Sequence, residues 1–438
     1  AAVKALNTCY TYLGNMDEQL YCEAMTDNAY TKQPNDATQN IGNGSYSTAD
    51  PYVKKVWDGR YTGIRMCNEL LENIDRVPDL DPELKKRYIG EAKVLRAYNY
   101  YELYTKFGDV PYTTKVLSIK ESMSIARTAK ATVIANVLAD LDEVINGNYL
   151  PTSYDADNKG RITRWAAMAI KAKIYLFEGN WTQVKNITST IMTEGGFKLF
   201  GSYAGLFEIA NEYNSEVILD AQYRPTSREH QMMYVFLPPT LGGYSQLSPL
   251  QELVDSYIML DGKTIKETGT SFDESHPYAN RDPRLKATVM YTGNSYTLAD
   301  GTEVVINCEK GEGKDGYGVG SDCSATGYYI KKYWDNTYRA TLYSGLNPIL
   351  IRYADILLMN AEALAELGEL DKTAWDATIK PIRARAGFTL ASAVEFPEGA
   401  SKDKLIEIVR NERRSELALE GHRHKDIIRW RIADEVLN

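Results

Sequence analysis

The residues of this chain that could do chemistry are the aromatic side chains in its polar loops. The segment 27–52 lacks helical periodicity and carries Tyr30, Tyr46 and Tyr52 among Asn, Gln and Asp. A second stretch, 291–343, holds nine Tyr and Trp residues in loops and short strands. A sugar site requires such rings, because the apolar C–H face of a pyranose stacks on a ring while neighbouring amides bond its hydroxyls. These loops therefore indicate carbohydrate binding.

Two of these rings are expected to form the binding surface. Tyr46 has Asn43 close in sequence, and Trp334 has Asn336, so that each ring lies near an amide able to bond sugar hydroxyls. Neither segment shows a periodicity that would assign its ring to a core. We therefore predict one shallow cleft facing the solvent, in which truncation of Tyr46 or Trp334 weakens binding without lowering the melting temperature. The alternative is that the rings pack on the scaffold, so that truncation costs stability instead.

The sequence contains partial matches to cofactor-binding and metal-binding motifs, but each lacks the neighbouring elements or ligands that the motif requires. GEGKDG (311–316) matches the glycine pattern of a dinucleotide site, but it has no strand before it and no helix after it. DADNKG (155–160) resembles the start of a calcium loop, but Lys159 and Ala166 occupy ligand positions. Paired carboxylates, as in a glycoside hydrolase, occur in no recognisable site. The sequence predicts no catalytic residue, no metal and no cofactor.

Composition and charge limit the class of protein. The 438 residues are 44% hydrophobic and 25% charged, as in a globular protein with a substantial core. A net charge of -9 argues against a nucleic-acid partner, which requires a surplus of Lys and Arg. Cys308 and Cys323 flank a glycine-rich stretch, so a disulfide between them is left open beside buried free thiols.

The elements that must position these loops are mainly helices. Helical spacing of apolar residues predicts helices in the first part of the chain at 53–75, 81–107, 130–146, 162–178 and 181–194. Strands are expected at 217–223 and 286–292, within a loop-rich region that ends near 346. Helices return at 349–368, 371–386, 402–420 and 424–437. The charges of 408–423 fall at helical spacing, which predicts solvated ion pairs on a helix surface.

Two segments have the pattern of paired antiparallel helices. AKIYLFEGNW (172–181) and AEALAELGEL (361–370) both place Ala seven residues before Gly, followed by a short turn and another helix. This pattern is similar to tetratricopeptide repeats, in which small residues let two helices approach closely. Such a helical scaffold says little about chemistry.

Six segments carry a resemblance to a known family. They are WDGRYTGIRMCNELLENI (57–74), GEAKVLRAYNYYELYTKFGDVPY (90–112), RITRWAAMAIKAKIYLFEGNW (161–181), RDPRL (281–285), PILIRYADILLMNAEALAELG (348–368) and IVRNERRSELALEGHRHKDIIRW (408–430). This set, in this order, resembles the SusD/RagB family of outer-membrane nutrient-binding lipoproteins. The combination of the second segment with the fifth is specific to that family.

The resemblance implies a mainly α fold with a scaffold of about four tetratricopeptide-like helix pairs. It implies an N-terminal SusD-like region (1–195) and a C-terminal RagB/SusD region (196–438), together forming one compact unit. Within the second region, 196–346 is a mixed insertion that carries the ligand site, and 347–438 are the returning helices. The family's lipidated N-terminal Cys is absent from the printed sequence, which we expect to be trimmed at both ends.

The resemblance also implies function and partners. Family members lie on the outer face of the outer membrane, held by a lipid anchor, and deliver oligosaccharide to a SusC-like TonB-dependent transporter. The ligand residues come from the loop 28–50, where Tyr46 is the best candidate, and from the insertion. The candidates in the insertion are Tyr291, Tyr296, Trp334 and Tyr338. We expect a glycan-binding protein and no enzyme; a peptide-capturing RagB-like member is the alternative, and a glycoside hydrolase is the third reading.

Overall fold

The computed structural model describes residues 2–32 and 37–437, so that residues 33–36 of the predicted binding loop lie outside the description. The chain divides into two compact units. The first comprises residues 1–14, 47–196 and 218–221, and the second comprises 15–46, 197–217 and 222–438. This division passes close to the predicted boundary at 195, but it places 15–46 with the second unit and differs from the single compact unit that we expected.

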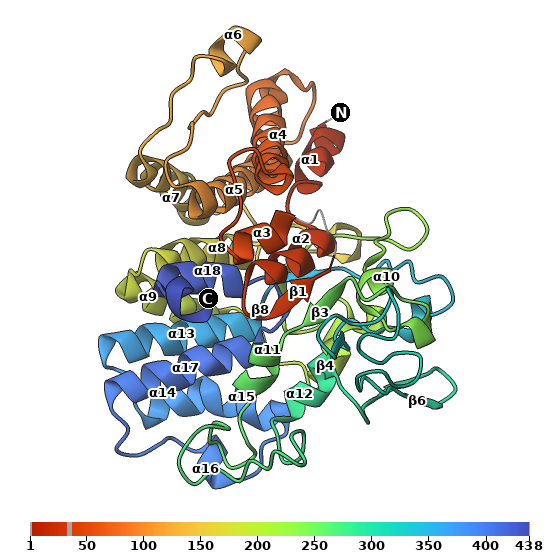
Figure 1. Cartoon of the computed structure of the whole chain (residues 1–438). Helices are drawn as coiled ribbons and strands as arrows, with labels where there is room; N and C mark the ends of the chain where they lie inside the picture. Colours follow the sequence, from red (N-terminus) through yellow and green to blue (C-terminus); the bar gives the residue numbers. More distant parts are fainter. Residues whose placement is uncertain (1, 33–36, 438) are drawn as a thin grey trace. The chain divides into compact units, whose positions relative to one another are not determined.

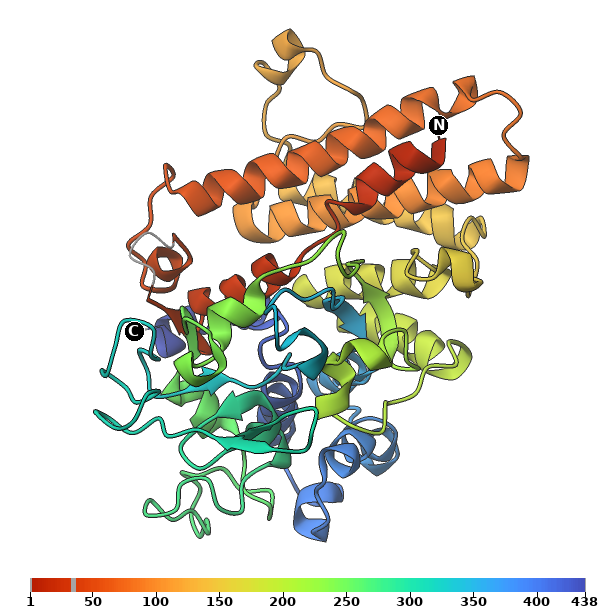
Figure 2. The same cartoon turned by 90° about the vertical axis from the view of Figure 1, so that its right-hand side faces the viewer.

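The first unit is built of helices. They are α1 (Ala2–Tyr10), α4 (Pro51–Asn73), α5 (Pro82–Phe107), α6 (Ile119–Ser122), α7 (Lys130–Asn146), α8 (Arg164–Phe177) and α9 (Trp181–Glu194), with 3-10 turns η2 (Ile74–Arg76) and η3 (Ala156–Asn158). Figure 2 shows the two long helices α4 and α5, in orange, lying along each other, and α5 then packs on α7, α7 on α8 and α8 on α9. The helices predicted from apolar spacing are confirmed within two residues at each end.

The longest helix, α5, shows how the local sequence sets its bounds. The Asp81 side chain accepts a hydrogen bond from the Leu84 amide at 2.9 Å and caps the N-terminus, and Pro82 occupies the first turn. Gly108 ends the helix with a φ of 68°, which a residue with a Cβ adopts only under strain. Capping and stop signals therefore fix both ends.

Close packing of α4 on α5 depends on a glycine. A Cβ added to Gly63 would lie 2.8 Å from the Cβ of Tyr12 and 2.9 Å from the Asn99 side-chain nitrogen. Gly59, one helical turn earlier, has open space around it. The helices can approach this closely only because position 63 has no side chain.

The predicted helix pairs form at both similar segments. α8 and α9 are joined through Gly179, with a φ of 70°, and in the second unit α13 (Tyr353–Leu367) and α14 (Lys372–Ala377) are joined through Gly368, with a φ of 74°. The mainly α fold with tetratricopeptide-like pairing is confirmed. Among the described residues, no helix combines the length and the apolar character that a membrane span requires.

The second unit combines helices with short strands and long loops. Its helices are α2 (Met16–Tyr21), α3 (Ala37–Gly42), α10 (Met232–Phe236), α11 (Gln251–Ser256), α12 (Pro283–Thr288), α13, α14, α15 (Ile379–Ala386), α16 (Ala391–Val394), α17 (Lys402–Glu416), α18 (Arg423–Trp430) and α19 (Ala433–Val436). Its 3-10 turns are η1 (Cys22–Met25), η4 (Ala204–Phe207), η5 (Ile209–Asn211), η6 (Pro239–Leu241) and η7 (Asn336–Tyr338). In Figure 1, α13, α14, α15 and α17 lie together, and Figure 2 shows the loop-rich part in green and cyan.

The strands of the second unit pair in small antiparallel ladders. β1 (Ala29–Thr31) pairs with β3 (Leu247–Pro249), β4 (Val289–Met290) with β7 (Tyr329–Ile330), and β5 (Ser295–Thr297) with β6 (Glu303–Val305). β2 (Val217–Asp220) spans the division between the units, and β8 (Ile349–Arg352) precedes α13. These ladders hold the insertion loops in place.

Three expectations about secondary structure need correction. Residues 349–352 form a strand and not the start of a helix, because the β-branched Ile349 and Ile351 extend the chain before α13 begins. The strands β1 and β8 also fall outside the predicted region of about 195–345. In the predicted strand 286–292, the first three residues end α12 and only 289–290 are extended.

A buried ion cluster joins the segments of the second unit. The Arg352 guanidinium donates to Glu216 at 2.7 Å, to Glu416 at 2.6 Å and to Glu420 at 2.7 and 2.8 Å. Arg284 pairs with Glu416 at 2.9 Å. All five side chains are at most 1% exposed. Removing one partner from such a cluster leaves an uncompensated charge, so the cluster fixes how these segments assemble.

The prediction of solvated ion pairs along 408–423 is therefore wrong for this face. Glu412, Glu416 and Glu420 are buried and pair with cations from α12, from the end of β8 and from Lys332. Helical charge spacing reveals that one face carries charge. It does not reveal that distant arginines cover that face.

Candidate functional site

Two of the predicted residues, Trp334 and Asn336, line one groove in the second unit. The groove has a volume of about 620 Å³, within the range of ligand pockets. Its walls come from segments 204–210, 283–287 and 331–337 and from Thr297. The structure thus brings the Trp334 loop against η4, η5 and α12.

Both predicted polar groups at this groove are already engaged within the protein. The Trp334 indole Nε1 donates to the Thr297 carbonyl at 3.1 Å, and the Asn336 Nδ2 donates to the same oxygen at 2.6 Å. The Tyr296 ring lies behind the indole, at 5.1 Å between centroids and tilted by 59°. The indole is therefore held in one orientation with its other side toward the groove.

Tyr296 and Tyr338, which we predicted as ligand rings, are core residues. Tyr296 is fully buried, and its hydroxyl donates to the Ile330 carbonyl at 2.8 Å. It is the central residue of the three-residue strand β5, so its side chain points inward while its neighbours point out. Tyr338 ends η7 and is only 6% exposed. Neither ring offers a face to a sugar in this structure.

Tyr291 is half-buried and has one face covered. Its ring stacks on Tyr278 at 3.9 Å between centroids and 17° between planes. The hydroxyl of Tyr278 in turn donates to that of Tyr328 at 3.3 Å. Tyr291 therefore belongs to a tyrosine stack that packs against the core of the second unit.

Tyr46 is the most exposed of the predicted rings, with 52% of its surface accessible. The Asn43 side-chain oxygen accepts from the Ser45 amide at 3.0 Å and from the Ser45 hydroxyl at 2.6 Å, so it holds the turn before Tyr46. Neither Tyr46 nor Asn43 lines the groove at Trp334, and no described contact joins the two loops. The predicted single cleft formed by Tyr46 and Trp334 stays a prediction.

A cluster of one half-buried and two exposed tyrosines was missed by sequence reasoning. The rings of Tyr234, on α10, and Tyr244 stack at 5.7 Å with 15° between planes, and Tyr343 meets Tyr234 edge-on at 5.8 Å and 85°. Tyr244 is 46% exposed and Tyr343 is 39% exposed. We call these three residues the tyrosine platform. Tyr343 lay within the aromatic stretch that we singled out, but the sequence gives no sign that it meets a segment one hundred residues earlier.

The platform is held by its backbone. The Tyr244 amide donates to the Tyr234 carbonyl at 2.7 Å, which ties the two stacked residues together. The turn between them contains Gly242, with a φ of 86°, and Gly243, where a Cβ would lie 2.1 Å from a carbonyl oxygen. Only glycine fits this turn. The backbone that carries the two stacked rings is therefore held in one conformation.

The third ring is positioned by an isolated β-bridge and by an amide. His230 and Ser344 exchange backbone hydrogen bonds at 2.9 Å, which positions the chain at Tyr343. The Gln231 Nε2 donates to the Tyr343 hydroxyl at 2.8 Å. The platform thus combines exposed ring faces with an amide and a hydroxyl at its edge, the groups that sugar recognition uses.

Charges in the Trp334 groove are unevenly distributed. Burial and the neighbouring Lys286 ammonium lower the pKa of Lys331 to about 8. Burial and the Asp335 carboxylate raise the pKa of Glu208. Lysine and acidic side chains therefore both line this groove.

The part of the chain that the structure describes contains neither a metal-binding group nor a disulfide. No group of three His, Cys, Asp or Glu side chains there has a geometry that could hold a metal ion. Cys308 and Cys323 are buried free thiols, so the disulfide left open by the sequence does not form in this structure. Burial and the Asp315 charge raise the pKa of Cys308 to about 12, which keeps it protonated and unreactive.

Family models match both regions of the chain. A model described as the SusD family matches residues 206–438, and one described as starch-binding and associating with the outer membrane matches residues 4–176. Among curated relatives, SusD-like protein P25 of Formosa agariphila is 28% identical over 440 residues, covering 92% of this chain and 77% of that protein.

Solved structures of similar fold cover the whole chain. A SusD-like carbohydrate-binding protein from Bacteroides fragilis superimposes with a TM-score of 0.87 and 28% identity, covering 99% of this chain and 86% of that one. A laminarin-binding SusD-like protein superimposes with a TM-score of 0.77 and 25% identity, covering 99% and 92%.

Proposed function

The chain belongs to the SusD family, and on that premise we propose that it is a cell-surface protein that captures oligosaccharide. The observation that carries this proposal is the tyrosine platform. Its two outer rings are exposed to 46% and 39%, although nothing in the core requires them. Large exposed aromatic groups that are rigidly held are typical of binding surfaces.

The geometry of the platform suits a sugar better than a planar or apolar ligand. Tyr234 and Tyr244 are nearly parallel, so the exposed face of the stack is flat, and Tyr343 stands almost perpendicular beside it. A pyranose can lay its C–H face on the flat ring while its hydroxyls reach the phenol and amide at the edge. An extended polymer can occupy such an open surface without being enclosed.

Similar proteins support the same class of ligand. The Bacteroides fragilis protein is described as carbohydrate-binding, and the other solved relative as laminarin-binding. We infer a glycan ligand for this chain, with binding and no turnover. The predicted set of Tyr46, Asn43, Trp334 and Asn336 is retained as a proposed second contact region.

The place of action follows from the family. We propose that the protein is held at the outer face of the outer membrane by a lipid anchor and passes its ligand to a SusC-like TonB-dependent transporter. The family description of the N-terminal region, association with the outer membrane, supports this location. Co-purification from detergent-solubilised outer membranes tests the partner: a barrel protein is expected to accompany the chain, and recovery of the chain alone would contradict this part.

A glycan array probed beside a peptide library tests the ligand class. The purified chain is expected to bind oligosaccharides on the array and to leave the peptides unbound. The same array probed with the Tyr244→Ala and Tyr343→Ala double variant is expected to lose most of its signal. Binding to peptides with an unoccupied glycan array would replace the proposal by the peptide-capturing alternative.

A further inference from the structure

Two lysines and one nearby carboxylate set the charge along one part of the Trp334 groove. Lys286, on α12, and Lys331, just after β7, both line it. Within the described residues neither ammonium forms an ion pair; Lys331 donates to the Asn294 side-chain oxygen at 3.0 Å, and Lys286 is exposed. The Glu303 carboxylate, which accepts a hydrogen bond from the Ser295 hydroxyl, acts on both ammonium groups, so that the two lysines exceed it by one positive charge. This part of the groove therefore carries a net positive charge.

Two acidic side chains, Glu208 and Asp335, also line the groove. The two oxygens of Asp335 accept backbone N–H groups, from Ile209 at 2.7 Å and from Thr337 at 2.8 Å. Glu208 lies beside Asp335, and the Asp335 charge is the one that acts on it. Both acids therefore lie next to η5, where the Ile209 amide holds Asp335.

An aromatic wall stands in the same groove. Lys331 precedes Trp334 by three residues, and the indole is held by Thr297 and by Tyr296 behind it. A ring fixed in this way can stack on a sugar face, while an ammonium contacts a charged substituent of the same sugar. The volume of about 620 Å³ accommodates a ligand of that size.

We propose that the Trp334 groove is a subsite for an anionic sugar residue, with Lys286 and Lys331 contacting its carboxylate or sulfate group. This inference rests on the proposed glycan-binding function and adds the charge of the sugar to it. The tyrosine platform provides stacking without charge selection, and the groove selects glycans that carry negative charge.

Titration calorimetry with three oligosaccharides of equal length tests this inference. The probes are tetragalacturonic acid, which carries carboxylates, a carrageenan-derived tetrasaccharide, which carries sulfate esters, and the uncharged maltotetraose. The test variant is Lys286→Gln with Lys331→Gln, and Lys286→Gln alone serves as a second variant because Lys331 is half-buried. A matched control, Lys310→Gln with Lys402→Gln, removes two exposed lysines outside the groove.

The wild-type chain is expected to bind one anionic probe roughly tenfold more tightly than the groove variant does, with a difference that shrinks at high salt. Whether the carboxylate or the sulfate probe shows this loss identifies the anion. The control variant and any binding of the uncharged probe are expected to stay unchanged. Equal anion affinity in wild type and groove variant, or an equal loss for the uncharged probe, would overturn the inference. Glycan binding on the array would survive that result, so the two proposals fail separately.

Discussion

Replacing Arg352 by Met tests whether the buried ion cluster holds the second unit together. The change keeps much of the side-chain volume but removes five hydrogen bonds, to Glu216, to Glu420 and to both the side chain and the carbonyl of Glu416. The carboxylates then stay buried with fewer cations. Breaking a buried pair in this way costs about 3–5 kcal/mol.

The partners that remain place the effect near the lower end of that range. Glu216 and Glu416 retain Arg385, and Glu420 retains Lys332 at 2.7 Å. We therefore expect a loss of about 3 kcal/mol in the free energy of unfolding. At ~2–4 °C per kcal/mol for a large domain, this lowers the melting temperature by about 6–12 °C.

A second signature is a change in acid stability. Burial raises the pKa of Glu416, but Arg385, Arg352 and Arg284 outweigh it and lower that pKa to about 2. The stability from this group is present above the unfolded pKa near 4.5 and is lost as the pH falls toward 2. Without Arg352 the pKa of Glu416 rises, so acid unfolding is expected to begin at a higher pH.

Urea unfolding followed by circular dichroism, at neutral pH and along an acid series, measures both effects. The control is Arg65→Met, which removes an exposed pair with Glu69 on α4 and should change stability by no more than about 0.5 kcal/mol. A neutral-pH midpoint for Arg352→Met that matches the control would refute the reasoning that this cluster stabilises the unit.

Three further predictions concern packing, pH and redox state. Gly63→Ala should destabilise the first unit by about 1–3 kcal/mol in thermal melts, since its Cβ meets side chains at 2.8 Å, whereas Gly59→Ala on the same helix should stabilise slightly. Burial raises the pKa of Glu23 to about 7, so the folded chain holds a proton that the unfolded chain loses near 4.5. The free energy of unfolding should therefore fall as the pH rises from 4.5 to 7. A Glu23→Gln variant whose free energy of unfolding falls equally steeply over this pH range would contradict this. Cys308 and Cys323 should both titrate as free thiols after denaturation without reductant, and fewer than five thiols per chain would indicate a disulfide.

Local signals predicted the elements that have caps and regular spacing. The capped start of α5 at Asp81 and its end at Gly108 can be read directly from the sequence. The run before α13 was assigned wrongly to the helix, because a short apolar segment reads equally as strand or helix. The Tyr353 amide there donates to the Glu216 carbonyl at 2.8 Å, a contact from far along the chain that a local pattern does not contain.

The candidate site also depends on contacts between distant segments, which local sequence patterns do not contain. Composition indicated an aromatic, polar binding surface, but it could not distinguish Tyr296, which fills the core, from Tyr244, which faces solvent. Burial of a loop tyrosine depends on which distant segment packs against it. The platform forms because an isolated β-bridge between His230 and Ser344 brings Tyr343 to α10, and no spacing in the sequence encodes that bridge.

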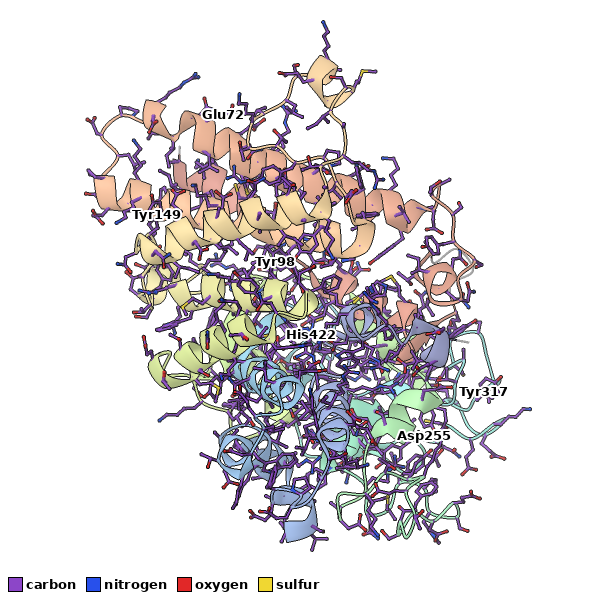
Figure 3. All side chains as sticks on the ribbon, turned by 90° about the vertical axis from the view of Figure 1, so that its left-hand side faces the viewer. Glu72, Tyr98, Tyr149, Asp255, Tyr317 and His422 are labelled. Carbon is purple, nitrogen blue, oxygen red and sulfur yellow. The ribbon has the colours of Figure 1, made fainter. Side chains whose placement is uncertain are left out.

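Calorimetric titration of Tyr244→Ala with an oligosaccharide identified on the array tests the central claim most directly. Its control is Tyr317→Ala, which truncates a tyrosine of similar exposure, 40% against 46%, on the loop labelled in Figure 3 and outside the platform. The account predicts a loss of about 2 kcal/mol, about thirty-fold in affinity, for Tyr244→Ala alone, with little change in melting temperature. Wild-type affinity in Tyr244→Ala, or an equal loss in Tyr317→Ala, would contradict the assignment of the platform as the glycan site.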